Sequence, residues 1–195
     1  MDEFLRNVDL GFFHVLDWGA YDHILFLGAM VCAYTFFEIK KVIWLVTAFT
    51  VGHTVALVLA SYDVVNVNMA WVEFLIPVTI IFTAIINLFS PKKINKGKNI
   101  LLILSTLAFG IVHGLGFSSF FEMIQGGAHG KFLTLIEFAL GIEAAQIVVV
   151  LVVLIFAFLF QNIFGRSKRD WVLVLSAIII GMVLPILKEN FEALF

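Results

Sequence analysis

Six long apolar stretches, each near the length of a bilayer-spanning helix, constrain the fold of this chain more than any other feature. A transmembrane helix needs about 20 mostly apolar residues. Such stretches lie at residues 20–38, 42–61, 71–89, 99–122, 133–162 and 171–188. Only 13% of the residues are charged, whereas a soluble domain carries about 25%. The sequence therefore predicts an all-α, polytopic membrane helix bundle with about six transmembrane helices, in contact with the lipid bilayer.

The segment before the first apolar stretch has a different pattern. In residues 1–17, apolar residues recur at near-helical spacing with charged residues between them: Phe4, Val8, Phe12 and Val15. This pattern is typical of a short amphipathic helix at the membrane interface. We therefore expect residues 1–195 to form a single transmembrane domain, with an interfacial helix in 1–17 and the six-helix bundle in 18–195.

The basic residues predict the orientation, because cytoplasmic connections are enriched in Lys and Arg. Both termini are expected outside. Nearly all acidic residues then lie on the outer side, where they would attract cations. Nine of the twelve basic residues lie on the side expected to be cytoplasmic: Lys40, Lys41, Lys92, Lys93, Lys96, Lys98, Arg166, Lys168 and Arg169.

Charge and cysteine content exclude several functions. The net charge of -2 argues against a nucleic-acid partner. The single cysteine, Cys32, cannot form a disulfide within the chain or a CxxC metal site. The chain has no GxxxxGK phosphate-binding loop, so it would not itself use ATP.

Seven ionisable side chains lie within the apolar stretches or at their ends, where such groups are costly and are candidates for function. At about 1.5 Å per helical residue, all seven fall in the outer half of the membrane. We therefore predict that most of them converge on one site that opens to the outside. They are Asp22, His23, His53, Glu73, His113, Glu137 and Glu143.

These residue types favour a transition-metal site. Three imidazoles with carboxylates suit a borderline divalent ion such as zinc, nickel or cobalt. The alternative is that each histidine is only a hydrogen-bonding partner between packed helices. Lys188 and Glu189 are expected to anchor the last helix at the interface. The predicted ligands are His23, His53, His113, Asp22 and Glu143, with Glu73, Gln146, Thr54, Asn87, His14 and Asp17 as accessory polar residues.

Five motifs resemble those of the HupE/UreJ family of bacterial membrane proteins. They are HVLDWGAYDHILF at 14–26, VTAFTVGHTVAL at 46–57, VEFLIP at 72–77, FGIVHGLGF at 109–117 and LGIEAAQ at 140–146. The family is regarded as nickel or cobalt permeases, so the resemblance implies a multi-pass protein of the bacterial inner (cytoplasmic) membrane. It also implies that Asp22, His23, His53, Glu73, His113, Glu143 and Gln146 occupy the family's characteristic polar positions.

Three functions remain open. The leading hypothesis is binding and transport of a nickel- or cobalt-type divalent ion through the outer-half site. The second is a zinc-dependent intramembrane hydrolase, in which three histidines hold zinc and a carboxylate activates its water. Asp22 or Glu143 would be the base, with help from Thr54, Ser118 or Ser119. The third is a non-catalytic, metal-binding accessory protein.

Overall fold

The computed structural model describes residues 3–89, 99–124 and 130–194, apart from the side chains at 99, 101, 119, 120 and 122–124. Within these residues the chain forms seven α-helices, one 3-10 turn at Phe36–Glu38, one π-helical turn at Leu159–Ile163, and no β-strand. The α-helices are α1 (Glu3–Val15), α2 (Asp22–Val31), α3 (Ile39–Ser61), α4 (Met69–Phe89), α5 (Asn99–Ile124), α6 (Lys131–Phe158) and α7 (Lys168–Leu194).

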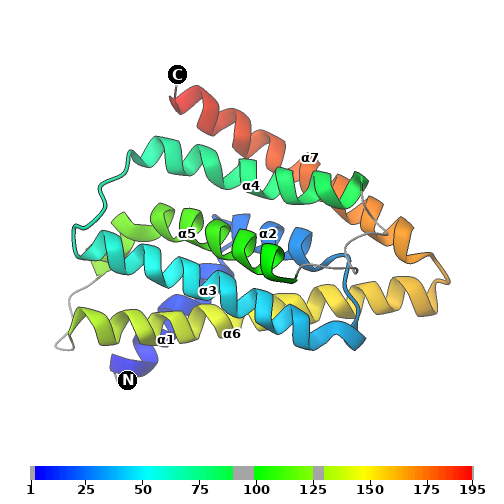
Figure 1. Cartoon of the computed structure of the whole chain (residues 1–195), viewed down its shortest axis with the longest axis horizontal. Helices are drawn as coiled ribbons and strands as arrows, with labels where there is room; N and C mark the ends of the chain where they lie inside the picture. Colours follow the sequence, from blue (N-terminus) through cyan, green and yellow to red (C-terminus); the bar gives the residue numbers. More distant parts are fainter. Residues whose placement is uncertain (1–2, 90–98, 125–129, 195) are drawn as a thin grey trace.

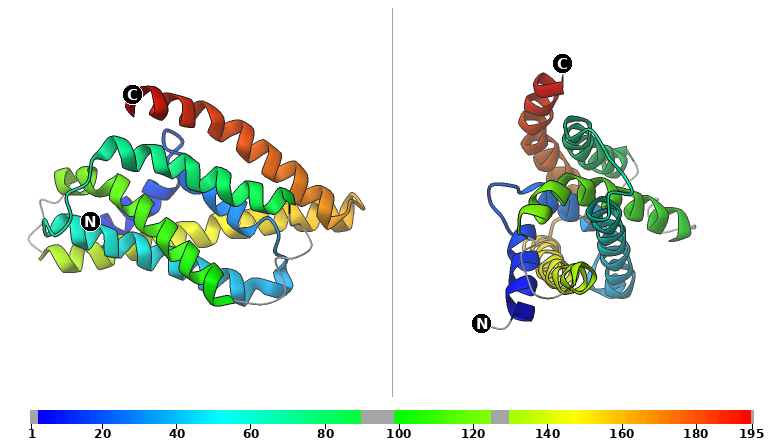
Figure 2. Two further views of the ribbon diagram at one scale, coloured as in Figure 1. Left: turned by 45° about the horizontal axis from the view of Figure 1, so that its top comes forward. Right: turned by 90° about the vertical axis from the view of Figure 1, so that its left-hand side faces the viewer.

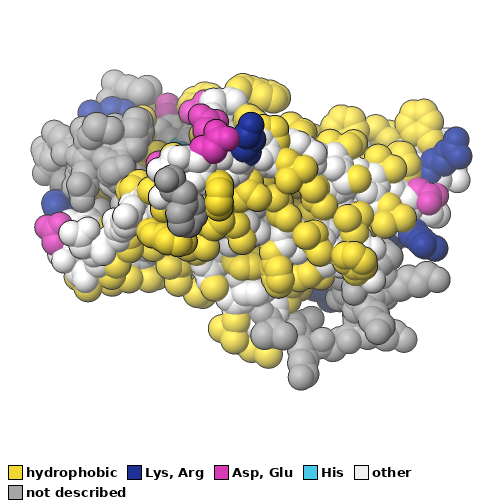
Figure 3. Space-filling view, turned by 90° about the horizontal axis from the view of Figure 1, so that it is seen from above, with side chains coloured by type: hydrophobic (Ala, Val, Ile, Leu, Met, Phe, Trp, Pro, Cys, Tyr) yellow, Lys and Arg dark blue, Asp and Glu magenta, His cyan; other side chains and the backbone are white. Residues whose placement is uncertain are grey.

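The expectation of an all-helical membrane protein is confirmed. Four helical segments in the described residues are long and apolar enough to cross a membrane: Phe36–Ser61, Met69–Phe89, Lys131–Ile163 and Lys168–Leu194. Asp22–Val31 and Leu102–Ser118 are shorter apolar helices, so the count of six spans stays a prediction. Figure 3 shows hydrophobic side chains over most of one face, with charged side chains in small separate groups.

The bundle is built from three helix pairs and one central helix. α3 packs on α5, α1 on α6, and α4 on α7, while α2 contacts α4, α6 and α7. α4 and α7 lie side by side along one edge of the molecule (Figures 1 and 2). Every residue from Leu25 to Tyr34 is buried, as expected for a helix that is apolar on all sides and surrounded by protein.

α2 is much shorter than the helix expected over 20–38: it has 10 residues and ends at Val31. In a continuing helix, the carbonyl of Ala29 would accept a hydrogen bond from the amide four residues later. Here it accepts one from Nδ2 of Asn87 on α4, at 2.7 Å. The buried Asn87 amide also contacts Sγ of Cys32 at 3.1 Å. Asn87, predicted as an accessory polar residue, thus lies at the end of this half-length helix.

α1 forms a helix as predicted and packs against α6, burying Asn7, Gly11 and Val15. The two backbones are in direct contact. A Cβ atom at Gly11 would collide with the carbonyl oxygen of Phe138, and one at Gly141 would collide with that of Val8. Next to this crossing, Nδ2 of Asn7 donates a hydrogen bond to the buried carboxylate of Glu137 at 2.7 Å. This close contact holds the last turn of α1 beside the centre of the bundle.

Candidate metal centre

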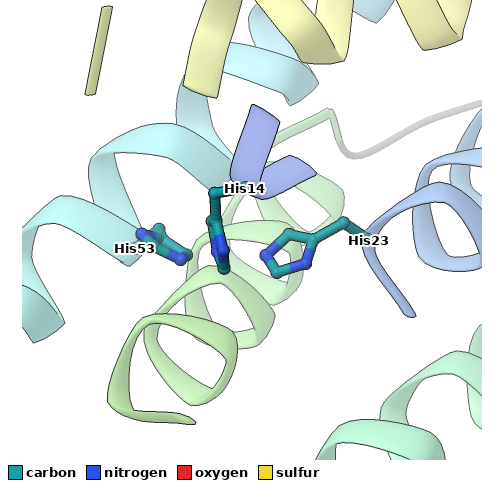
Figure 4. A group of neighbouring side chains, drawn as sticks. All are labelled: His14, His23 and His53. Atoms are coloured by element: carbon teal, nitrogen blue, oxygen red, sulfur yellow. The ribbon is translucent and has the colours of Figure 1, made fainter. Parts of the chain in front are cut away.

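Three histidines from three helices meet inside the bundle. His14 lies in the last turn of α1, His23 in the first turn of α2, and His53 in the middle of α3. Each offers one ring nitrogen, and these three atoms lie within 4.8 Å of one another. Figure 4 shows the three rings facing a common space. We call these residues the histidine group. The sequence predicted His23 and His53 as ligands and His14 only as an accessory residue.

The backbone contacts around the group explain its geometry. His53 is brought to α5 by a glycine contact, because a Cβ atom at Gly114 would collide with the carbonyl oxygen of His53 itself. His14 is carried by α1, which Gly11 holds against α6. Asp17, predicted as accessory, lies in the connection to α2, where its carboxylate accepts a hydrogen bond from the amide of Gly19 at 2.8 Å. Glycine thus allows the helices to approach until the imidazoles meet.

Asp22 orients His23. Its Oδ1 lies 3.1 Å from Nδ1 of His23 and also accepts the backbone amide of His23 at 3.0 Å. A carboxylate on one ring nitrogen fixes the tautomer and leaves Nε2 free to bind a metal. Nε2 of His23 is buried and has no hydrogen-bond partner among the described residues. Asp22, which the sequence predicted as a ligand, thus uses one carboxylate oxygen to hold the ring of His23.

His113 adjoins the group without belonging to it. Its ring centroid lies 5.4 Å from that of His23. Its Nδ1 lies 2.9 Å from the carbonyl oxygen of Phe109 on the same helix, which leaves Nε2 directed away from the helix backbone. That atom is also buried, with no hydrogen-bond partner in the part of the chain that the structure describes.

Unpartnered nitrogens are the feature that distinguishes this cluster from ordinary helix packing. Nε2 of His14, His23 and His113 and both ring nitrogens of His53 are buried without a hydrogen-bond partner in the described chain. Buried polar atoms nearly always have partners, so each exception needs an explanation such as an ion or water. Their number and convergence argue against the alternative that each histidine is a hydrogen-bonding partner between helices, and they fit a transition-metal ion.

The ring of His14 is neutral at neutral pH. Burial, reinforced by the neighbouring imidazole of His23, holds the pKa of His14 well below its usual range. A metal binds the unprotonated imidazole. His14 therefore needs no deprotonation before it can act as a ligand.

The predicted ligand Glu143 lies elsewhere, on the interface between α3 and α6. Its Oε1 accepts a hydrogen bond from the hydroxyl of Thr47 at 2.6 Å, and Glu143 is not part of the histidine group. Gln146 makes a second contact across this interface, since its Oε1 accepts the hydroxyl of Thr50 at 3.0 Å. Thr54 donates to the carbonyl oxygen of Thr50 within α3.

A cavity of about 590 Å³ opens beside the histidine group. Its lining includes His14, His23, Asp22, His113 and the predicted accessory residue Glu73. It also includes Glu189 and Asn190 of α7, which sequence reasoning missed. Glu189 was expected only to anchor the last helix, and no local pattern distinguishes it from Glu192.

A second cavity, of about 800 Å³, also has His14 in its lining. Most of its wall is apolar and comes from α1 and the following connection, including Leu10, Phe13 and Leu16. Arg6 and Asp9 lie on the same wall. His14 and Phe117 border both cavities, and their ring centroids are 3.7 Å apart. The linings of the two cavities thus share these two rings.

Comparison with known proteins identifies the family. The comparisons with curated proteins and with solved structures found no match. The family described as HupE / UreJ protein has a model that matches residues 1–187. Since the match covers nearly the whole chain, and the structure shows apolar helices around a histidine group, this chain belongs to the HupE/UreJ family.

Proposed function

We propose that this protein binds a nickel- or cobalt-type divalent ion at His14, His23 and His53 and transports it across the membrane. One observation carries the proposal: three imidazoles from three different helices converge with buried, unpartnered nitrogens. Ionisable groups inside a membrane protein commonly mark a substrate pathway. Membership of the HupE/UreJ family supports the same reading.

The donor set favours a borderline transition metal over magnesium or calcium. Imidazole nitrogens suit nickel, cobalt, copper and zinc, whereas the hard cations prefer oxygen ligands. Three protein ligands leave coordination positions open for water, as transient binding requires. Nε2 of His113 is a fourth nitrogen close to His23. We infer that it takes part when the ion enters or leaves the group.

The α3–α6 interface supports an inward route. Thr50 precedes His53 by about one helical turn and Thr47 by about two, on the side of α3 that meets α6. They pair with Gln146 and Glu143 respectively. Nε2 of Gln146 is buried with no hydrogen-bond partner among the residues described. This polar column continues inward from the histidine group, where the ion would have to pass.

We propose an inner (cytoplasmic) membrane location with both termini outside. The charged residues at the end of the bundle away from the histidine group support this orientation. Glu38 pairs there with Lys41 at 3.6 Å and with Lys168 at 3.8 Å, and Arg166 and Arg169 lie nearby in sequence. The other predicted cytoplasmic lysines, Lys92, Lys93, Lys96 and Lys98, lie outside the described residues.

Uptake by sealed vesicles tests the proposal. Vesicles with purified protein should accumulate radioactive nickel or cobalt, and His53→Ala should abolish accumulation while the protein remains folded and monodisperse. Thr83→Ala is the control, because the Thr83 hydroxyl donates only to Thr79 within α4, and it should transport normally. Equal accumulation by His53→Ala and the control would exclude transport through this group.

The second cavity favours a second candidate, the zinc-dependent hydrolase. An apolar cleft that carries Arg6 and ends at His14 could accept an amphiphile. Three imidazoles could hold zinc, which would activate a water molecule for the hydrolysis of an ester or amide. Of the assisting hydroxyls, Thr54 donates to Thr50 and Ser118 to Leu115, and the side chain of Ser119 lies outside the described part.

The candidates differ in measurable ways. A hydrolase should retain stoichiometric zinc through purification and release fatty acid from a lipid substrate, and chelation should stop the release. A transporter should exchange its metal freely and show no such release. The third alternative, a non-catalytic accessory protein, predicts metal binding with neither activity.

A further inference from the structure

The mouth of the 590 Å³ cavity is formed by two helices that are far apart in sequence. Glu73 lies near the start of α4, and Glu189 and Asn190 lie near the end of α7. Nδ2 of Asn190 donates a hydrogen bond to the carbonyl oxygen of Glu73 at 2.7 Å. Because α4 and α7 run side by side (Figure 1), this bond holds the two carboxylate-bearing ends together.

The cavity changes in chemistry from its mouth to its floor. Glu73 and Glu189 at the mouth are exposed. At the floor, His23 and His113 are only 3% and 1% exposed. Nε2 of His113 is buried, lines the same cavity, and lacks a hydrogen-bond partner among the described residues. An ion that enters the cavity would thus meet carboxylate oxygens first and imidazole nitrogens afterwards.

We propose that Glu73 and Glu189 form a separate outer station that captures a hydrated divalent cation before it reaches the histidines. The inference rests on the proposed function, because the station would supply the same histidine group. It adds a second binding site of different chemistry and gives a role to the last helix of the chain.

Ligand chemistry explains why two stations are useful. Carboxylates bind divalent ions that still keep several waters, and such a site exchanges quickly. Imidazoles bind borderline metals more tightly after water has been lost. Two carboxylates at a cavity mouth also raise the local cation concentration. The ion would therefore lose its hydration shell in two steps, and not in one step at a buried site.

Glu192 provides a matched control on the same helix. It lies one turn beyond Glu189 and does not line the cavity. Its carboxylate pairs with Lys188 at 3.7 Å, and its side chain is 65% exposed. Glu189→Gln and Glu192→Gln change the net charge equally, so a difference between them reports position and not overall charge.

Binding of Mn²⁺ to the purified full-length protein tests the station directly, because Mn²⁺ suits carboxylate and water ligands. Paramagnetic resonance of free Mn²⁺ gives the bound fraction. We expect a weak site in the wild type that persists when His14, His23 and His53 are all changed to alanine. The site should weaken roughly two- to fivefold in Glu189→Gln, disappear in Glu73→Gln/Glu189→Gln, and remain in Glu192→Gln.

Two results would overturn the station. One is equal Mn²⁺ binding by the wild type and Glu73→Gln/Glu189→Gln. The other is equal weakening by Glu189→Gln and Glu192→Gln, which would indicate a diffuse surface charge effect. In vesicles, Glu189→Gln should raise KM for nickel roughly two- to fivefold with kcat unchanged. If Mn²⁺ binds as expected but vesicles take up no metal, the station stands and the transport function fails.

Discussion

A single carboxylate sets the orientation of the imidazole at the start of α2. Asp22 and His23 are neighbours in sequence, and a helix directs neighbouring side chains about 100° apart. The two therefore need not face one ion. The observed 3.1 Å contact between Oδ1 of Asp22 and Nδ1 of His23 gives Asp22 a positioning role. A residue that hydrogen-bonds a metal-binding histidine orients its ring and so affects the metal affinity.

We predict that Asp22→Asn weakens metal binding roughly 10- to 100-fold, because the amide can no longer fix the tautomer of His23. Calorimetric titration with nickel or cobalt measures the change. Asp17→Asn is the control, since that carboxylate binds only the nearby Gly19 amide, and it should leave affinity unchanged. If Asp22→Asn abolished binding as completely as His23→Ala, Asp22 would be a ligand.

The contribution of His14 to metal affinity should depend little on pH near neutrality. A normal imidazole begins to take up protons near its pKa of about 6.5 and then competes with metal. Burial lowers the pKa of His14 well below that range, so protons should compete at this ligand only in more acidic solution. The affinity lost in His14→Ala should therefore be nearly the same at about pH 8 and at about pH 6.5. A loss that shrinks steadily as the pH falls across that interval would show that His14 titrates normally.

Helix α1 acts as part of the bundle. Its close contact with α6 depends on Gly11 and Gly141, whose missing side chains allow the two backbones to touch. The buried pair of Asn7 and Glu137 strengthens the same crossing. Because His14 follows Gly11 by less than one helical turn, any shift of α1 also shifts one member of the histidine group.

Gly11→Ala should therefore impair metal binding without changing a ligand. Its Cβ atom would collide with the Phe138 carbonyl oxygen, and relieving such overpacking costs about 1–3 kcal/mol. We expect a lower thermal unfolding temperature and an affinity close to that of His14→Ala. Gly181→Ala, where a Cβ atom meets nothing within 4 Å, should change neither. Wild-type affinity in Gly11→Ala would mean that His14 does not depend on this contact.

The whole molecule has an apolar exterior and two chemically different ends. The histidine group and its acidic cavity lie at the end of the bundle that holds both termini in the proposed orientation. Lysines and arginines gather at the other, where α6 turns into α7. A membrane would then separate a cation-collecting end from a basic, cytoplasmic end.

Cysteine labelling in intact cells tests this orientation. Trp18 is 86% exposed near the histidine end, and Ser167 is exposed before α7. An impermeant maleimide should label Trp18→Cys in intact cells and Ser167→Cys only after permeabilisation. The wild type is the control, because its Cys32 is fully buried and should stay unlabelled. The reverse pattern would place the termini in the cytoplasm.

The positions of the long helices follow from the sequence alone. The apolar stretches at 42–61 and 71–89 became Ile39–Ser61 and Met69–Phe89, because length and hydrophobicity are local properties. The sequence also predicted the depth of polar residues, since depth follows from position along a helix. His23 and His53 were predicted to lie at a similar depth, and in the structure their ring nitrogens lie within 4.8 Å of each other.

Which polar side chains face one another depends on the rotation and contacts of each helix, so this could be learned only from the folded chain. Glu143 was predicted to lie with the histidines but pairs with Thr47 on α3, about two helical turns from His53. α2 ends at Val31. There the side-chain amide of Asn87, which is distant in sequence, donates a hydrogen bond to the carbonyl oxygen of Ala29. His14 and Glu189 reach the site from the two ends of the chain, through backbone contacts that no local pattern encodes.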